Sequence, residues 1–235
     1  MKKILLTTLF TVVAAAATAE TALTGLHLGV DGGLQRTSFD QALNTNNAGN
    51  DAVSKIKKPS YNWTGAASLG YFQDKDGLHY GAKFSVGKTL GRREKNATDG
   101  LQVGRTLYTD VKTKVSQEYS LALTGQLGTY VAADTVVYGL LGVKRVRYDL
   151  DLTALNVHSV KGNVGKTVWG PVFGLGMKKA LSDAWAFNTE VSYEMYKKIS
   201  TGNLQTPGVL AANEAIGMTI KPRIFNVTVG LSHKF

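Results

Sequence analysis

The stretch "NVTVGLSHKF", from Asn226 to Phe235, decides the fold class of this protein. Its apolar residues Val227, Val229 and Leu231 alternate with polar or small ones. Successive side chains of a β-strand point to opposite faces, so this pattern predicts a strand with one apolar and one polar face. The stretch also stops on an aromatic residue without a polar tail, whereas termini usually fray. A final strand that pairs with the first strand to close a sheet would explain both features.

The other end of the chain has the features of a secretory signal peptide. Lys2 and Lys3 precede an apolar run from Ile4 to Ala17, and the tripeptide "ATA" ends at Ala19. A basic start, a short apolar run and an A-x-A motif are typical of signal peptides, although a short anchor helix is the alternative. We expect residues 1–19 to be a cleaved signal peptide and residues 20–235 to form one exported domain.

Composition narrows the class of the exported protein. The chain has no cysteine, 26 glycines and only 4 prolines. Without cysteine the fold does not rely on disulfides. No apolar run after the signal peptide approaches the ~20 residues that a membrane helix needs. A soluble periplasmic β-protein and an outer-membrane β-barrel therefore remain as alternatives.

Period-2 alternation recurs along the chain and predicts eight strands. The fifth segment is strand-like, but its register is ambiguous because apolar residues fall on both faces. The segments are Leu26–Gln35, Trp63–Tyr71, Leu78–Gly87, Glu118–Leu127, Val136–Tyr148, Trp169–Lys178, Trp185–Met195 and Arg223–Phe235.

The connections between these segments alternate between long and short. The long ones are expected at residues 37–61, 89–116, 151–166 and 198–221, and the tight ones at residues 74–77, 132–135 and 181–184. Long loops at one end and tight turns at the other are typical of an all-β, eight-stranded antiparallel up-and-down transmembrane β-barrel with long extracellular loops and short periplasmic turns. Closure leaves no unpaired edge in the bilayer. Aromatic residues predicted at the two membrane interfaces are Trp63, Tyr71, Tyr80, Tyr119, Tyr138, Trp169, Trp185, Tyr193 and Phe235.

The last three strands resemble those of the OmpA-like and opacity-protein-like eight-stranded outer-membrane β-barrels. The similarity lies in "PVF" at Pro171–Phe173 with Gly176 shortly after, "TEVSY" at Thr189–Tyr193, and the final "GLSHKF". It is specific over residues 169–235 and only architectural before them. The resemblance implies that the strand carrying Val229, Leu231 and Phe235 is the signal read by the barrel assembly machinery. It does not extend to a peptidoglycan-binding domain.

The inward faces of the predicted strands carry charges of both signs. An eight-stranded barrel has an interior just wide enough for side chains, and buried charges need partners. We expect a salt-bridged polar plug around Glu190, with Lys83 as one candidate partner; a gated channel is the alternative. The predicted lumen network comprises Asp31, Lys83, Glu118, Lys178, Glu190 and Glu194.

Charge also suggests what the outside of the barrel binds. The chain carries a net charge of +10, and basic residues concentrate in the second long connection. A basic outer rim favours lipopolysaccharide phosphates or acidic polysaccharides on a host or neighbouring cell, while a merely solvated surface is the alternative. No nucleic-acid recognition motif is present. The predicted polyanion-binding residues are Arg92, Arg93, Lys95, Arg105, Lys112 and Lys114.

No catalytic or metal-binding pattern stands out. The four histidines, at positions 27, 79, 158 and 233, are isolated from one another, and no serine completes a triad with them. We expect no enzyme activity and no cofactor. The expected role is surface structure or adhesion in the outer membrane of a Gram-negative bacterium, and a small diffusion porin or gated channel is the alternative.

Overall fold

The computed structural model describes residues 23–45, 54–56, 59–90, 93–97, 101–103, 106–108, 110–155, 160–200 and 216–235. The predicted signal peptide lies outside these residues. The described part consists of strands, and none of it forms a helix long and apolar enough to cross a membrane. The strands are β1 (Gly25–Thr45), β2 (Ser54–Ile56), β3 (Ser60–Lys75), β4 (Leu78–Leu90), β5 (Arg93–Ala97), β6 (Leu101–Val103), β7 (Thr106–Tyr108), β8 (Asp110–Ala132), β9 (Thr135–Leu155), β10 (Val160–Ala180), β11 (Trp185–Met195), β12 (Ile199–Ser200) and β13 (Ile216–Lys234).

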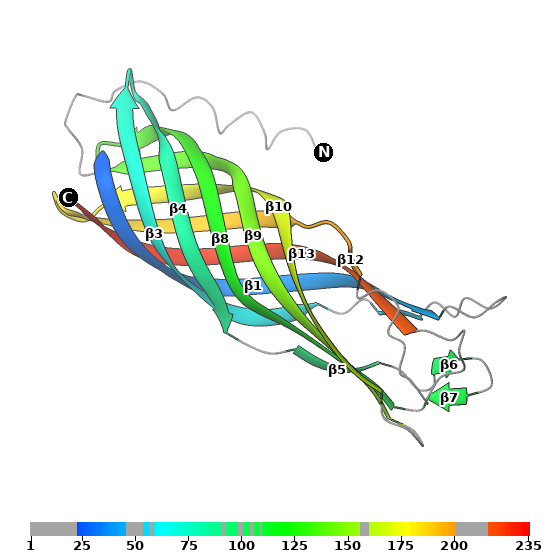
Figure 1. The fold of residues 1–235 in the computed structure, drawn as a ribbon. Coiled ribbons are helices and arrows are strands. Elements are labelled where there is room, and N and C mark those ends of the chain that lie inside the picture. Colours follow the sequence, from blue (N-terminus) through cyan, green and yellow to red (C-terminus); the bar gives the residue numbers. More distant parts are fainter. Residues whose placement is uncertain are drawn as a thin grey trace, which may run out of the picture.

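Eight long strands form a closed antiparallel barrel (Figure 1). Their order around the barrel is β1, β3, β4, β8, β9, β10, β11 and β13, and β13 pairs with β1 to close the sheet. The closing ladder runs from His27 opposite Lys234 to Thr45 opposite Ile216. The backbone NH of Phe235 extends it by donating to the carbonyl oxygen of Leu26 at 2.9 Å. The predicted fold class and strand number are confirmed.

Tight turns join neighbouring strands at one end of the barrel, which we call the turn end. Between β3 and β4 only Asp76 and Gly77 intervene, and both have positive φ angles, of 54° and 78°. Two central residues with positive φ define the type I′ turn, whose twist matches that of the flanking strands. The other end, which carries β5, β6 and β7 in Figure 1, we call the loop end.

The strands extend further toward the loop end than the sequence predicted. β1 continues to Thr45, β8 starts at Asp110, and β9 and β10 reach Leu155 and Val160. Much of the connection expected at residues 151–166 is therefore strand. A strand that projects beyond the membrane meets water on both faces, so neither face needs to be apolar. The sequence pattern therefore lacks the alternation that identifies the membrane-spanning part of each strand.

The wall and the lumen have opposite characters. Large apolar side chains on the outward positions stay exposed, including Val30, Leu141 and Leu175, each more than 60% exposed. Inward positions are mostly polar and buried, such as Gln35, Gln126 and Glu194. An apolar outside and a polar inside are expected for a barrel whose solvent is lipid.

Candidate functional site

The lumen carries the densest polar chemistry of the described residues, and its side chains lie in three successive layers. The layer nearest the turn end is a cluster of aromatic and basic side chains. Next comes a network around Glu190, which we call the middle network. Toward the loop end a second network surrounds Glu194, which we call the upper network.

In the turn-end cluster, Phe72 lies between two histidines and a lysine. Its ring stacks on His79 at 5.4 Å between centroids and meets His27 edge-on at 5.6 Å. The Lys178 ammonium lies 3.2 Å from the centroid of the Phe72 ring. Nδ1 of His79 contacts Oδ1 of Asp74 at 2.7 Å. These rings and the ammonium thus contact one another inside the lumen near the turn end.

The middle network converges on one carboxylate oxygen. Oε1 of Glu190 accepts hydrogen bonds from Lys83 Nζ at 2.5 Å, from Tyr138 Oη at 2.8 Å and from Gln126 Nε2 at 3.2 Å. These donors come from β4, β9 and β8, so the contacts span the lumen. Nζ of Lys83 also lies 4.0 Å from Oδ2 of Asp31.

Two glycines let side chains reach across their neighbouring strands. Gly176 lies opposite both Tyr138 and Glu190 in the ladders of β10. A Cβ atom at position 176 would lie 2.5 Å from Cζ of Tyr138, so only glycine leaves room for the ring to pass over β10. Gly230 has the same role between Asp31 and Asn188, whose Nδ2 donates to Oδ1 of Asp31 at 2.7 Å.

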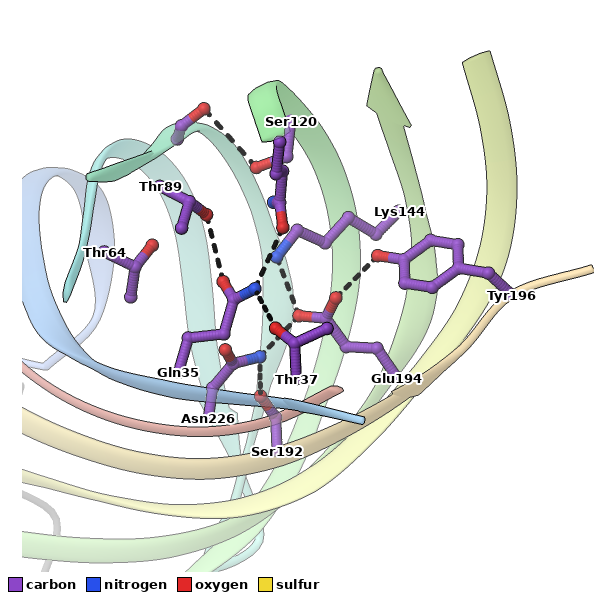
Figure 2. Close-up of polar contacts among 12 residues, drawn as sticks. Gln35, Thr37, Thr64, Thr89, Ser120, Lys144, Ser192, Glu194, Tyr196 and Asn226 are labelled. Atoms are coloured by element: carbon purple, nitrogen blue, oxygen red, sulfur yellow. Dashed lines mark hydrogen bonds and ion pairs between the residues drawn. The ribbon is translucent and has the colours of Figure 1, made fainter. Parts of the chain in front are cut away.

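The upper network, drawn in Figure 2, holds Glu194 from three sides. Lys144 Nζ and Asn226 Nδ2 donate to Oε1 at 2.7 and 2.5 Å, and Tyr196 Oη donates to Oε2 at 2.5 Å. The Glu194 side chain is only 2% exposed, so Lys144 supplies the countercharge that its burial requires.

A second group of amides and hydroxyls completes the upper network. Nε2 of Gln35 donates to Oε1 of Gln117 and to Oγ1 of Thr37, both at 2.9 Å, while Thr89 donates to Oε1 of Gln35 at 3.0 Å. Gln35 and Gln117 come from β1 and β8, which are not neighbours in the sheet. Their contact therefore bridges the lumen.

A cavity of about 90 Å³ separates the middle and upper networks. Since a water needs roughly 10–15 Å³ of such volume, the cavity has room for several waters. Its polar lining includes Asp31, Lys83, Lys144, Glu190 and Glu194. A smaller cavity of about 20 Å³, between the middle network and the turn-end cluster, has room for one water.

This arrangement, an apolar outer wall around a charged lumen, agrees with the comparison to known protein families. The family described as "Outer membrane protein beta-barrel domain" matches residues 5–232. The chain belongs to this family. It is therefore an outer membrane β-barrel.

Solved structures of outer membrane β-barrels share its fold at low sequence identity. OprG from Pseudomonas aeruginosa is 15% identical with a TM-score of 0.55, over 92% of this chain and 100% of that one. The outer membrane protease OmpT from Escherichia coli is 8% identical with a TM-score of 0.52, over 96% of this chain and 100% of that one. A search of curated proteins found no match. At these identities the likeness concerns the fold alone.

Most of the predicted lumen residues of this outer membrane β-barrel come together. Lys83 contacts Glu190, as the sequence analysis expected, and Asp31 lies beside them. Lys178 lies one layer closer to the turn end, and Glu194 lies one layer closer to the loop end.

Glu118 lies outside the lumen network, so its predicted position there is wrong. A β-bulge between Gln117 and Ser120 shifts the register of β8 against β9. A bulge inserts an extra residue and changes the face on which the following side chains lie. The Glu118 side chain is 43% exposed and contacts Nε of Arg147 at 3.0 Å. Glu118 therefore belongs to the outer surface.

The predicted polyanion-binding residues lie only partly within the described backbone. Arg93 and Lys95 belong to β5, and Lys112 and Lys114 belong to β8, which pairs with β5. These four basic residues therefore lie on two paired strands, where a loop was expected, and the same segment of β8 also pairs with β9. Their side chains lie outside the description, as do Arg92 and Arg105 altogether.

The residues of the predicted assembly signal lie on the outward face of the closing strand. Val229, Leu231 and Phe235 are 51%, 43% and 71% exposed. The reading of this strand by assembly machinery stays a prediction.

Sequence reasoning missed several lumen residues and misplaced one. Tyr138, predicted at a membrane interface, is 1% exposed and donates to Glu190, because the register of β9 turns it inward. Lys144 was missed because β9 carries apolar residues on both faces, so the sequence alone does not show which face points inward. Phe72 and Tyr196 lie just beyond the predicted ends of their strands.

Proposed function

We propose that the protein is a non-enzymatic outer-membrane surface barrel whose lumen does not conduct and whose basic loop-end segments bind polyanions. The observation that carries this proposal is the pair of hydrogen-bonded networks across the lumen. Each contains an ion pair, Lys83 with Glu190 and Lys144 with Glu194. An open pore would need these pairs to separate, and each separated charge would lose the partner that its burial requires.

The turn-end cluster supports the same conclusion. Phe72, His79 and Lys178 pack against one another across the lumen, next to the buried side chains of Val136 and Tyr138. An ion that crossed the barrel would meet the Phe72 and His79 rings and the Lys178 ammonium here after leaving the charged networks. Function then rests with the segments that project from the barrel, since loops on a rigid scaffold commonly carry binding.

The absence of enzyme activity is inferred from the one Asp–His contact within the described residues. Asp74 holds Nδ1 of His79, but Nε2 of His79 is buried without a hydrogen-bond partner among those residues. A serine-type nucleophile would need its hydroxyl at this nitrogen. The OmpT likeness carries no activity over to this chain at 8% identity.

Planar-bilayer conductance of the refolded protein tests the closed lumen. We expect a silent bilayer after insertion has been verified by a heat-modifiable band shift, with a general porin as the positive control. Reproducible open steps from the wild type would contradict the proposal and favour a narrow channel. The cavity of about 90 Å³ between the networks is the feature that supports this second candidate, because it already holds space for water.

Binding of a sulfated or phosphorylated polysaccharide to cells that display the protein tests the second half of the proposal. Replacement of Arg93, Lys95, Lys112 and Lys114 with glutamine should abolish binding that the wild type shows at physiological salt. A matched variant with Lys75 and Lys179 changed to glutamine, near the turn end, should bind like the wild type. Equal binding by all three proteins would contradict the polyanion role.

A further inference from the structure

On four strands of the outer wall, the first charge that follows the apolar side chains toward the loop end is basic, whereas on β8 it is Glu118. On β9 the outward residues Leu141 and Val143 are followed by Arg145, and on β4 Phe84 and Val86 are followed by Lys88. The first outward charge toward the loop end is also basic on β1 and β13, where it is Arg36 and Arg223. Within the described residues, no carboxylate lies among the outward apolar side chains below these positions.

Arg145 is the least satisfied of these cations. Its Nε is buried and has no hydrogen-bond partner within the described residues, and no described carboxylate forms an ion pair with it. Its guanidinium carbon lies 5.9 Å from the centroid of the Trp169 ring, which is within the range of a cation–π contact. A partly buried guanidinium whose Nε lacks an acceptor favours an anion supplied from outside the chain.

Neighbouring strands place an aromatic and an apolar side chain beside Arg145. Trp169 lies directly opposite it on β10, and Leu121 lies opposite it on β8. Lys88 comes from β4, the strand next to β8, and β4, β8, β9 and β10 lie side by side in Figure 1. Arg147 is already engaged by Glu118 at 3.0 Å and by Asp149 at 3.7 Å. Lys88 lies two strands away from Arg145 and its charge acts on Glu118, so Arg145 is the cation available to a ligand.

The surface below Arg145 fits the apolar part of the same ligand. Trp169 is 59% exposed, and Leu123, Leu141 and Val143 form an exposed apolar strip toward the turn end. In barrels of this class the end with the longer connections faces outward from the cell, so Arg145 lies at the headgroup level of the outer leaflet. A ligand with an anionic group beside Arg145 and acyl chains along the apolar strip is a phosphorylated amphiphile.

We propose that Arg145 and Trp169 form a binding site on the outer wall for the phosphate headgroup of an outer-leaflet lipid, the lipid A part of lipopolysaccharide. The Arg145 guanidinium binds the phosphate oxygens through paired N–H donors, a geometry that a lysine cannot supply. Trp169 packs beside the sugar–acyl junction, where aromatic side chains are favoured. This site is distinct from the lumen and from the loop-end segments of the proposed function.

Native mass spectrometry of the folded protein in a non-ionic detergent tests the proposal by counting bound lipid. Titration with bisphosphorylated lipid A should give one tightly bound molecule on the wild type. Arg145→Gln should weaken that binding at least tenfold, and lipid A stripped of its phosphates should bind the wild type as weakly. Arg36→Gln removes the same charge from β1, on the opposite side of the barrel, and should change affinity less than twofold.

The outcomes separate the possible sources of the anion and the possible causes of a loss. An equal loss in Arg36→Gln and Arg145→Gln would overturn the site in favour of diffuse attraction. Full competition by millimolar inorganic phosphate would overturn the lipid assignment, because the site would then recognise the phosphate alone. Trp169→Phe should retain most of the binding and Trp169→Ala should not; equal binding by both would remove Trp169 from the site. The heat-modifiable band shift verifies folding of each variant.

Discussion

The charged side chains in the lumen of this barrel and those on its outer wall differ in whether they contact a partner of opposite charge. Inside, Lys83 and Lys144 each contact a carboxylate within 2.7 Å. Outside, Arg145 has no acceptor for its buried Nε within the described residues. The lumen charges are therefore part of the folded structure itself, whereas the wall charge becomes fully satisfied only in the membrane. This difference predicts which substitutions change folding and which change binding.

The largest expected effect comes from removing the acceptor of the middle network. Glu190→Ala leaves the Lys83 ammonium buried without its carboxylate and removes the partner of Tyr138 and Gln126. We expect a loss of about 3–5 kcal/mol in the free energy of unfolding, measured by urea denaturation in lipid vesicles.

A double variant tests whether the unpaired Lys83 charge causes this loss of stability. Lys83→Met combined with Glu190→Leu removes both charges and should recover most of the lost stability, since well-packed apolar residues often replace a buried ion pair at little cost. If the double variant is as unstable as Glu190→Ala, loss of the ion pair is not the cause.

A smaller effect is expected at the glycine that lets Tyr138 reach Glu190. Gly176→Ala forces a Cβ into the Tyr138 ring and should cost about 1–3 kcal/mol in the same assay. Gly139→Ala on β9 is the matched control, because its Cβ would meet only the carbonyl oxygen of Leu127, at 3.9 Å. We expect the control to stay within about 0.5 kcal/mol of the wild type. Equal losses of stability at both positions would mean that the close approach of the Tyr138 ring to Gly176 is not what makes the substitution costly.

On the wall, Arg145→Gln should leave the unfolding free energy within about 0.5 kcal/mol of the wild type in vesicles of a zwitterionic lipid. Its cation has no ion-pair partner within the described residues, so its removal strands no carboxylate. A loss of unfolding free energy as large as that of Glu190→Ala would contradict the expected difference between charged residues of the wall and of the lumen.

The smallest effect is expected at the exposed pair of Asp134 and Lys179, whose Oδ2 and Nζ lie 3.6 Å apart near the turn end. The hydroxyl of Thr135, followed by Lys179, lowers the pKa of Asp134 below its ordinary value. A lowered pKa means that the contribution is present at neutral pH and is lost as the pH falls through the folded-state pKa. Asp134→Asn should barely move the thermal midpoint at pH 7, because exposed pairs contribute little. A clear shift would contradict this.

The sequence was sufficient for the barrel and for part of its lumen. Alternation located all eight barrel strands, because a lipid-facing wall and a polar lumen impose a strict period of two. It failed on β9, where Val136, Leu140 and Val146 face the lumen and Val137 and Leu141 face outward. With apolar residues on both faces, neither register is favoured, so Tyr138 and Lys144 could not be assigned.

The remaining errors came from local geometry that one sequence does not encode. The bulge in β8 that turns Glu118 outward depends on its pairing with β9. The Asp74–His79 contact forms across the type I′ turn, between residues that face each other only after the hairpin closes. The site around Arg145 joins β9 and β10, and it depends on the register that places Trp169 opposite Arg145.

One comparison tests the account most directly: the unfolding free energies of wild type, Glu190→Ala and Arg145→Gln, in zwitterionic vesicles with and without lipopolysaccharide. We predict that lipopolysaccharide stabilises the wild type and Glu190→Ala by the same amount and leaves Arg145→Gln nearly unchanged, because a ligand stabilises only the folded state that binds it. We also predict that Glu190→Ala is destabilised equally in both membranes. Equal stabilisation of all three proteins would contradict the division between a self-contained lumen and a lipid-binding wall.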